Sequence, residues 1–366
     1  MKASGYQVYV SFSGETGSKI ENVGAYDSTG TFLGLVLNAD DGAYQELRGL
    51  AVDAAGRLYV ADAYKNGSAV DVFSATINAD GFSRDFLTTL ITPASSKALL
   101  HPYGLAFDGD NLFVSSQDTN VVSGYAISGK KKPSAKSLPP AAYLEKLHPK
   151  GGYYGGTFVA SAQPVPVGKK TPPAVDPKDG GLSMSGFDPA TAATDDKPPE
   201  AADDAKPAKK QARHSVRGIV FAGKRLYVAD QAADRVGIYG HKNGTFHGWI
   251  SVTDNANANP DALDKPVGLA LSPTDGRIYI GSPKNEAIFA YDPSSKKLEL
   301  VVSSASPGAA GALEDLSGLS FTPDGTLLFG SRSQQQLYSC DVSTGAVSPL
   351  GAKLGDAPEC LLVVSV

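Results

Sequence analysis

The chain has 366 residues, of which 42% are hydrophobic and only 19% charged, and it contains 40 glycines and 24 prolines. This composition predicts many turns and few long surface helices, and no apolar run reaches the roughly 18 residues of a membrane-spanning helix. The formal net charge of −5 and the mere two cysteines, Cys340 and Cys360, exclude sequence-independent nucleic-acid binding, a disulfide framework and a cysteine metal site. We therefore expect neither a nucleic-acid partner nor a membrane partner.

The first expected element is a strand over residues 6–12, whose sequence YQVYVSF alternates in the manner of a half-buried strand. Two more strands are expected at 21–27 and 31–37. Met1 leads into this region without the charged and apolar leader of a signal peptide. The chain start therefore fits either a cytoplasmic protein or a mature exported protein that has lost its signal peptide.

One segment type then occurs five times along the chain. Each copy has a short apolar strand after a marker glycine, a turn rich in Gly and Asp, a second strand, a polar loop and a third strand. The marker glycines are Gly49, Gly104, Gly218, Gly268 and Gly318. Neighbouring markers lie 50 or 55 residues apart, except for one interval of 114 residues. A period of this length predicts sheets that repeat around an axis, with one large insertion.

A sixth unit is divided between the two ends of the chain. The N-terminal strands supply its second, third and fourth strands, and the C-terminal sequence PECLLVVSV at 358–366 supplies the first. Such pairing removes the open sheet edge that would otherwise invite aggregation. The sequence thus predicts an all-β, six-bladed β-propeller that forms a single domain over residues 1–366 and is closed by pairing of the C-terminal strand with the N-terminal blade.

The long interval contains a Pro/Ala/Lys-rich insertion at 148–213, between the third and fourth blades. Before it, AAYLEKL at 141–147 is expected to complete the outer strand of the third blade. Residues 169–212 are too polar and proline-rich to repay the entropy of ordering, which predicts disorder. The aromatic, β-prone stretch 151–167 is expected to pack on the propeller and to act as a lid, because loops of this length are usually functional or disordered.

The repeated segments resemble the NHL repeat, whose pattern is Pro-x-Gly-Ile-Ala-Val-Asp, then Gly-x-Ile-Tyr-Val-Ala-Asp, then Asn-x-Arg-Ile. The match is clearest at 49–73, 101–125 and 218–239. The resemblance implies a six-bladed propeller of the superfamily that includes amidating lyases, gluconolactonase-like enzymes, strictosidine-synthase-like enzymes and pure binding modules. It therefore indicates the fold and leaves the function open.

In such a ring, the residues that precede the markers are expected to converge on the mouth of the central channel. We expect Arg48 and Arg217 to bind an anion, because planar guanidinium groups suit carboxylates and phosphates. The remaining substrate-binding candidates are Glu359, Lys265 and Ser317, and the catalytic candidates, which would move or orient protons, are His101, His214 and Tyr103. In the alternative interpretation, the same side chains form salt bridges between blades.

The resemblance also bears on metals. Amidating lyases hold zinc with histidines before the marker positions, where this chain has Arg48, Tyr103 and Arg217. Gluconolactonase-like propellers surround a divalent ion with a Glu, two Asn and an Asp, and only Glu359 occupies a matching position. The sequence therefore predicts no metal ligands and no other cofactor.

Together these features predict a monomeric, metal-independent enzyme of lyase or hydrolase type, acting at the top-face channel mouth on an anionic or polyoxygenated small molecule. One alternative is a non-catalytic NHL-type scaffold that binds a peptide, glycan or protein. Another is a divalent-metal-dependent lactonase or lyase.

Overall fold

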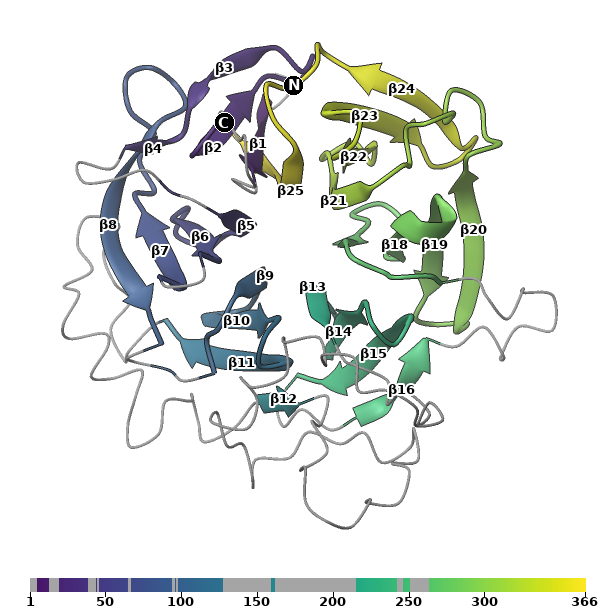
Figure 1. Ribbon diagram of the computed structural model, residues 1–366, viewed down its shortest axis with the longest axis horizontal. Helices are drawn as coiled ribbons and strands as arrows, with labels where there is room; N and C mark the ends of the chain where they lie inside the picture. Colours follow the sequence, from purple (N-terminus) through teal and green to yellow (C-terminus); the bar gives the residue numbers. More distant parts are fainter. Residues whose placement is uncertain are drawn as a thin grey trace, which may run out of the picture.

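Six antiparallel sheets stand around a central axis in the computed structural model (Figure 1). The prediction of an all-β six-bladed propeller is confirmed. The structure describes residues 5–12, 20–38, 44, 46–64, 67–93, 96, 98–127, 159–161, 215–241, 246–250 and 263–366. Within these ranges, no helix is long and apolar enough to cross a membrane.

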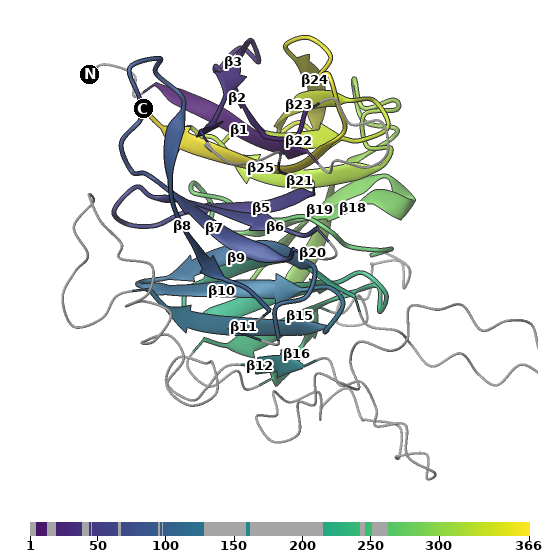
Figure 2. The same ribbon diagram turned by 60° about the vertical axis from the view of Figure 1, so that its left-hand side comes forward.

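The first blade joins the two ends of the chain, as predicted. Its strands, from the channel outward, are β25 (Pro358–Ser365), β1 (Tyr6–Phe12), β2 (Val23–Tyr26) and β3 (Phe32–Leu35). The β25–β1 register runs from Tyr6 opposite Ser365 to Phe12 opposite Pro358. Figure 2 shows β25 lying between β1 and the inner strand of the sixth blade. The last strand of the chain thereby closes the ring.

The other five blades are continuous in sequence. From the channel outward, their strands are β5 (Leu47–Val52), β6 (Leu58–Asp62), β7 (Ala69–Phe73) and β8 (Arg84–Ile91); β9 (Pro102–Asp108), β10 (Asn111–Ser116), β11 (Val121–Ala126) and β12 (Val159–Ser161); β13 (Val216–Ala222), β14 (Arg225–Asp230), β15 (Arg235–Gly240) and β16 (Phe246–Ile250); β17 (Leu269–Leu271), β18 (Ile278–Ser282), β19 (Ala287–Asp292) and β20 (Lys297–Ser303); and β21 (Leu316–Phe321), β22 (Leu327–Ser331), β23 (Gln336–Asp341) and β24 (Ala346–Leu350). A short strand that follows β3, β4 (Leu37–Asn38), pairs in parallel with β8 of the second blade.

The outer strand of the third blade differs from the prediction. It is β12, which pairs antiparallel with β11 and lies inside the predicted insertion, so the assignment of this strand to 141–147 is wrong. The segment at β12 reads Val-Ala-Ser after an aromatic stretch, which favours a strand, whereas AAYLEKL consists largely of good helix formers. Residues 141–147, the expected disorder of 169–212 and the expected lid outside β12 lie beyond the described residues.

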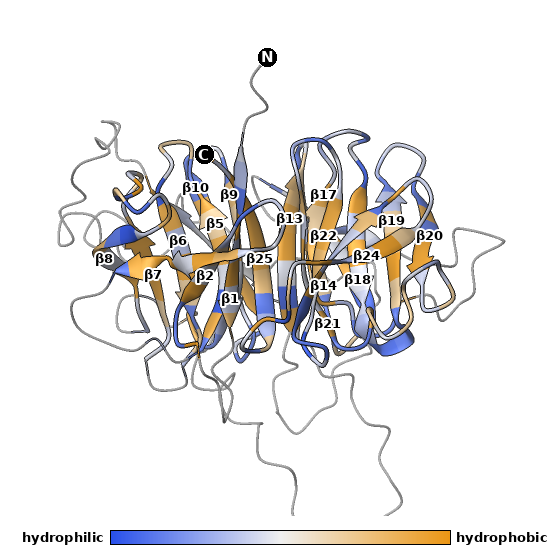
Figure 3. Ribbon diagram, turned by 90° about the horizontal axis from the view of Figure 1, so that it is seen from above, coloured by the Kyte–Doolittle hydropathy of each residue, from blue (hydrophilic) through white to orange (hydrophobic). Residues whose placement is uncertain are grey.

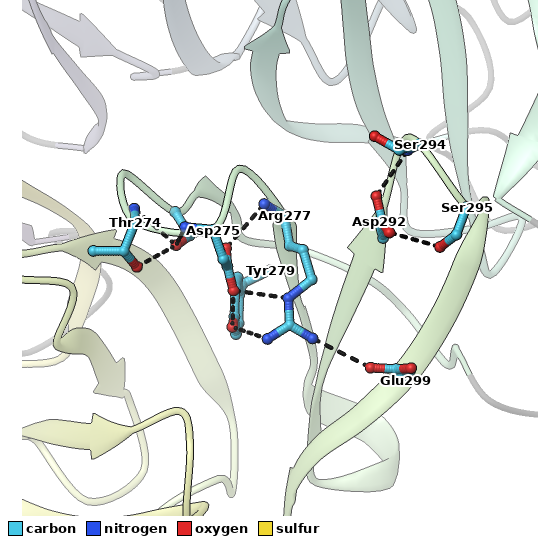
Figure 4. Close-up of polar contacts among 9 residues, drawn as sticks. Thr274, Asp275, Arg277, Tyr279, Asp292, Ser294, Ser295 and Glu299 are labelled. Carbon is cyan, nitrogen blue, oxygen red and sulfur yellow. Dashed lines mark hydrogen bonds and ion pairs between the residues drawn. The ribbon is translucent and has the colours of Figure 1, made fainter.

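Charged side chains brace the hairpins at the channel edge. In the turn between β17 and β18, the Asp275 carboxylate accepts hydrogen bonds from Arg277 Nε at 2.7 Å and from the Tyr279 hydroxyl at 3.1 Å (Figure 4). Arg277 Nη1 lies 3.2 Å from the Glu299 carboxylate. In the hairpin between β5 and β6 of the second blade, the Asp53 carboxylate accepts the equivalent hydrogen bonds from Arg57 Nε and the Tyr59 hydroxyl. These pairs fix the ends of the inner strands.

The core lies between adjacent blades. Hydrophobic residues cover most of the strands, and hydrophilic residues gather in the loops at the two faces (Figure 3). A recurrent contact places an aromatic ring of one blade edge-on against an inner-strand phenylalanine of the next. The ring centroids are 5.0 Å apart for Tyr59 and Phe107, 4.8 Å for Phe113 and Phe221, and 4.9 Å for Tyr279 and Phe321. Such edge-to-face pairs add to the hydrophobic packing and fix the inner strands laterally.

Candidate functional site

The marker glycines set the diameter of the ring. A Cβ atom built on Gly49 would lie 2.3 Å from the carbonyl oxygen of Tyr103, and one built on Gly218 would lie 2.4 Å from that of Val267. Each of the five inner strands with a marker glycine therefore approaches the next so closely that a side chain does not fit at that position. The residue before a marker is held against the glycine of the preceding blade, which explains why these residues come together around the channel.

Two serines fix the backbone of the predicted arginines. The Ser115 hydroxyl accepts a hydrogen bond from the Gly104 N–H at 2.7 Å and donates one to the Arg217 carbonyl at 2.5 Å. The Ser11 hydroxyl donates in the same way to the Arg48 carbonyl at 2.6 Å. Both serines are fully buried, so these hydrogen bonds are shielded from water.

The central channel contains a cavity of about 490 Å³. Four of the predicted residues line its polar end: Arg48, Tyr103, Ser317 and Glu359. Arg217 is not part of the cavity lining but lies next to its polar end. Its guanidinium stacks on the Tyr103 ring, 4.9 Å from the ring centroid. Ser317 is 2% exposed, and its hydroxyl has no hydrogen-bond partner among the described residues.

Two predicted residues do not join this group. Lys265 is exposed, has a left-handed φ of 54° and donates its backbone N–H to Asp234 at 2.8 Å, so the turn directs it away from the cavity lining. His214 lies outside the described residues. His101 lies next to the mouth, on the side of Arg48.

Arg48 belongs to a buried ion network. Its Nη2 lies 2.8 Å from Glu46 Oε1, and its Nη1 contacts the carboxylate of Glu359, which in turn lies 2.8 Å from Arg332 Nε. Burial opposes the charge of Arg48, but Glu359, Tyr103 and Glu46 together outweigh it and raise the pKa of Arg48. These pairs connect the second, first and sixth blades, as the salt-bridge interpretation of the sequence anticipates.

Arg217 is held differently. Its Nε and Nη2 lie 3.1 Å and 2.8 Å from Gln231 Oε1, and its Nη1 contacts the side-chain oxygen of Gln117. No described carboxylate lies within the 4.0 Å of an ion pair from this guanidinium. Burial lowers the pKa of Arg217, which still remains charged because arginine is so basic. Among the described residues, its direct hydrogen bonds therefore go to amide oxygens, and the charges of Glu359 and Asp118 act on it only from a greater distance.

Tyr103 lies between the two arginines. The Arg48 guanidinium is 5.7 Å from its ring centroid, and that of Arg217 is 4.9 Å away. Burial raises the pKa of Tyr103 to about 12; the charge of Glu359 adds to this effect, and the two guanidinium groups oppose it. The phenol is therefore protonated at neutral pH and acts as a hydrogen-bond donor.

His101 is held as a cation. Its Nε2 lies 3.2 Å from Glu46 Oε1 and its Nδ1 lies 3.4 Å from Asp118 Oδ1. Burial by itself would lower the pKa of His101, but Asp118 and Glu46 raise it to about 9. The backbone adopts a left-handed φ of 53°, and its N–H donates to the Ser68 hydroxyl at 3.0 Å.

Four residues at the mouth were not predicted from the sequence: Gln117, Asp118, Gln231 and Arg332. They occupy the loops between second and third strands, after β10, β14 and β22. The residues that precede the marker glycines, on which the prediction rests, belong to the other set of loops on this face. An alignment of the residues that follow each second strand would have found these four, because both sets of loops lie on the same face.

The donor set at the mouth does not fit a divalent metal. Among the described ranges, no three His, Cys, Asp or Glu side chains are placed to hold an ion. The carboxylate in the expected position, that of Glu359, is already held between two guanidinium groups. Positive neighbours disfavour a cation at this place.

The fold and the ring of inner strands define a six-bladed β-propeller. No protein-family model matches the chain, and no curated protein matches its sequence. A putative 6-phosphogluconolactonase from Bacteroides fragilis is similar in structure, with 13% identity, a TM-score of 0.55 and coverage of 99% of this chain and 98% of that one. A propeller from a nidogen/laminin complex has 11% identity, a TM-score of 0.56 and coverage of 99% and 98%. The periplasmic gluconolactonase of Pseudomonas aeruginosa has 15% identity, a TM-score of 0.52 and coverage of 99% and 100%. At such identities the similarity shows the fold.

Proposed function

We propose that the protein binds a small monoanion at the mouth of its central channel. The Arg217 guanidinium supplies the positive charge, and the Tyr103 hydroxyl donates a hydrogen bond. The observation that carries this proposal is the difference between Arg217 and the other cations of the mouth. Arg48, Arg332 and His101 each have a carboxylate within 4.0 Å, whereas the described partners of Arg217 are two amide oxygens and the ring of Tyr103.

A single guanidinium without a described carboxylate partner favours a ligand with one negative charge. A carboxylate suits it best, because two parallel N–H···O hydrogen bonds match the guanidinium fork.

Binding is better supported than turnover. A lyase or hydrolase needs a group that exchanges a proton near neutral pH. The pKa values of Tyr103, about 12, and of His101, about 9, keep both groups protonated there. The predicted enzymatic activity therefore stays a prediction, and the location of the cavity inside the channel favours a small ligand over a macromolecular partner.

The proposal is tested by exchanging the head group at constant chain length. Hexanoate and 1-hexanol are titrated into the protein in a calorimeter. Replacing Arg217 with Gln should weaken hexanoate binding by roughly tenfold or more, because a hydrogen bond to a charged group is lost, and leave hexanol binding unchanged. The matched control is Arg277→Gln, which removes a guanidinium from the turn between β17 and β18, outside the cavity lining. If hexanoate binds Arg217→Gln as tightly as it binds the native protein, the proposal is wrong.

A further inference from the structure

Below the polar mouth, the channel is lined by branched aliphatic side chains. The residue that follows each marker position lines the cavity in every blade: Leu50, Leu105, Ile219, Leu269, Leu319 and Leu361. Each is 9% exposed or less. The six blades therefore contribute one continuous apolar belt.

A second apolar ring lies two residues further along the inner strands. Phe107, Phe221 and Phe321 line the cavity here, together with Leu271. The three phenylalanines are half-buried and are fixed by edge-to-face contacts with rings of the neighbouring blades. This end of the cavity is thus formed before any ligand binds.

The charges of the lining stand at one end only. Of the described residues that line the cavity, Arg48 and Glu359 are the charged ones, and both belong to the mouth. From Tyr103 to Phe107 the lining is neutral over four residues of strand, which is roughly 13 Å. Beyond the mouth, the described side chains that a ligand meets are apolar or carry an uncharged hydroxyl group.

The width of the bore suits a hydrocarbon chain. The centres of ligand atoms can lie within about 490 Å³, which over roughly 13 Å corresponds to a cylinder roughly 7 Å wide for those centres. Carbon atoms in contact are about 4 Å apart, so an extended methylene chain or one planar ring fits this diameter. Transfer of methylene groups from water to such apolar walls is favourable by about 0.8 kcal/mol each.

We infer that the ligand is an amphiphilic monoanion: a carboxylate on an unbranched alkyl chain or a single-ring hydrocarbon body, with the head group at Arg217 and the body in the apolar bore. The assignment of the head group rests on the proposed function. The assignment of the body rests on the two apolar rings of the channel.

The first experiment varies the chain at a constant head group. Acetate, butyrate, hexanoate and octanoate are titrated calorimetrically into the full-length protein. Affinity should rise about fourfold for each added methylene group. If the four acids bind equally, and do so through Arg217, the inference is wrong and the proposed function stands. If affinity rises with length equally for the alcohols and for Arg217→Gln, the bore binds hydrocarbon but the proposed anion site, and with it the amphiphilic monoanion, is refuted.

A second experiment locates the chain in the bore. Leu271 is 37% exposed and lines the lower ring, so Leu271→Glu introduces a carboxylate there with little risk to folding. The matched control is Leu300→Glu on β20 of the same blade, where the side chain is 58% exposed and away from the cavity lining. Octanoate should bind Leu271→Glu at least tenfold more weakly, acetate equally well, and both should bind Leu300→Glu normally. Undiminished octanoate binding by Leu271→Glu would overturn the inference.

Discussion

Replacing Glu359 with Gln tests the buried ion network at the channel mouth. Glu359 is 3% exposed and lies between the guanidinium groups of Arg48 and Arg332. Glutamine has nearly the same shape, so the change removes one charge and little volume. The two arginines would then face each other across a site from which water is largely excluded.

The expected cost follows from the exposure of the partners. Removing one member of a buried ion pair costs roughly 3–5 kcal/mol. Arg48 keeps a second carboxylate, that of Glu46, and the Arg332 side chain is 24% exposed, so we expect the lower limit, about 3 kcal/mol. The free energy of unfolding is measured in urea by the fluorescence of Trp249, the single tryptophan of the chain.

The control is Glu299→Gln, because Glu299 pairs with Arg277 at 3.2 Å but is 57% exposed. Exposed pairs contribute about 0–1 kcal/mol, so this variant should be nearly as stable as the native protein. The double variant that also carries Arg332→Gln should recover part of the stability, because one unbalanced charge is removed. If Glu359→Gln costs no more than Glu299→Gln, the network does not stabilise the ring and the reasoning is refuted.

Three further predictions concern the surroundings of the mouth. The pKa of His101 is about 9 in the folded protein and 6.5 without its partners, so its contribution to the free energy of unfolding is complete below pH 6.5 and is lost as the pH rises through 9. The free energies of unfolding of the native protein and of His101→Gln should therefore converge as the pH rises across this range. A constant difference between them would contradict the assignment. Gly49→Ala places a methyl group 2.3 Å from the Tyr103 carbonyl and should cost about 1–3 kcal/mol, whereas Gly355→Ala, with its nearest neighbour at 3.4 Å, should be almost neutral in the same urea assay. Ser115→Ala leaves a buried N–H and a buried carbonyl without their hydrogen bonds and should lower the free energy of unfolding by about 1–3 kcal/mol; an unchanged denaturation midpoint would show that water replaces the hydroxyl.

The ring of inner strands could be predicted from the sequence because one physical requirement recurs in each repeat. Only glycine allows the carbonyl group of the next blade to approach as closely as Tyr103 approaches Gly49. This requirement explains why a glycine recurs at a regular interval in the sequence. The residue before each glycine is then placed at the channel mouth by its position in the inner strand. Closure by the terminal strand could be predicted for a different reason: 358–366 has Cys360 in place of the glycine, but its apolar pattern fits the inner strand that the N-terminal blade lacks.

The distinction between the two arginines could not be predicted. Both precede a marker glycine, yet Arg48 is neutralised and Arg217 is not paired with a described carboxylate. The difference depends on Gln117, Gln231 and Arg332, which come from other loops and whose orientation is no part of the repeat. The apolar bore also depends on a register that becomes visible only when all six inner strands are assembled.

The pairing of β25 with β1 has a consequence for how the protein forms during synthesis. The strand that β1 needs at its inner edge, β25, lies about 350 residues later in the sequence, so β1 is synthesised long before its partner. Until β25 is synthesised, the inner edge of β1 has no strand to pair with. The contact that covers this edge joins residues about 350 positions apart in the sequence. Contacts of such large sequence separation form slowly. The nascent protein is therefore exposed to premature association through this edge, and the arrival of one short C-terminal strand ends that period.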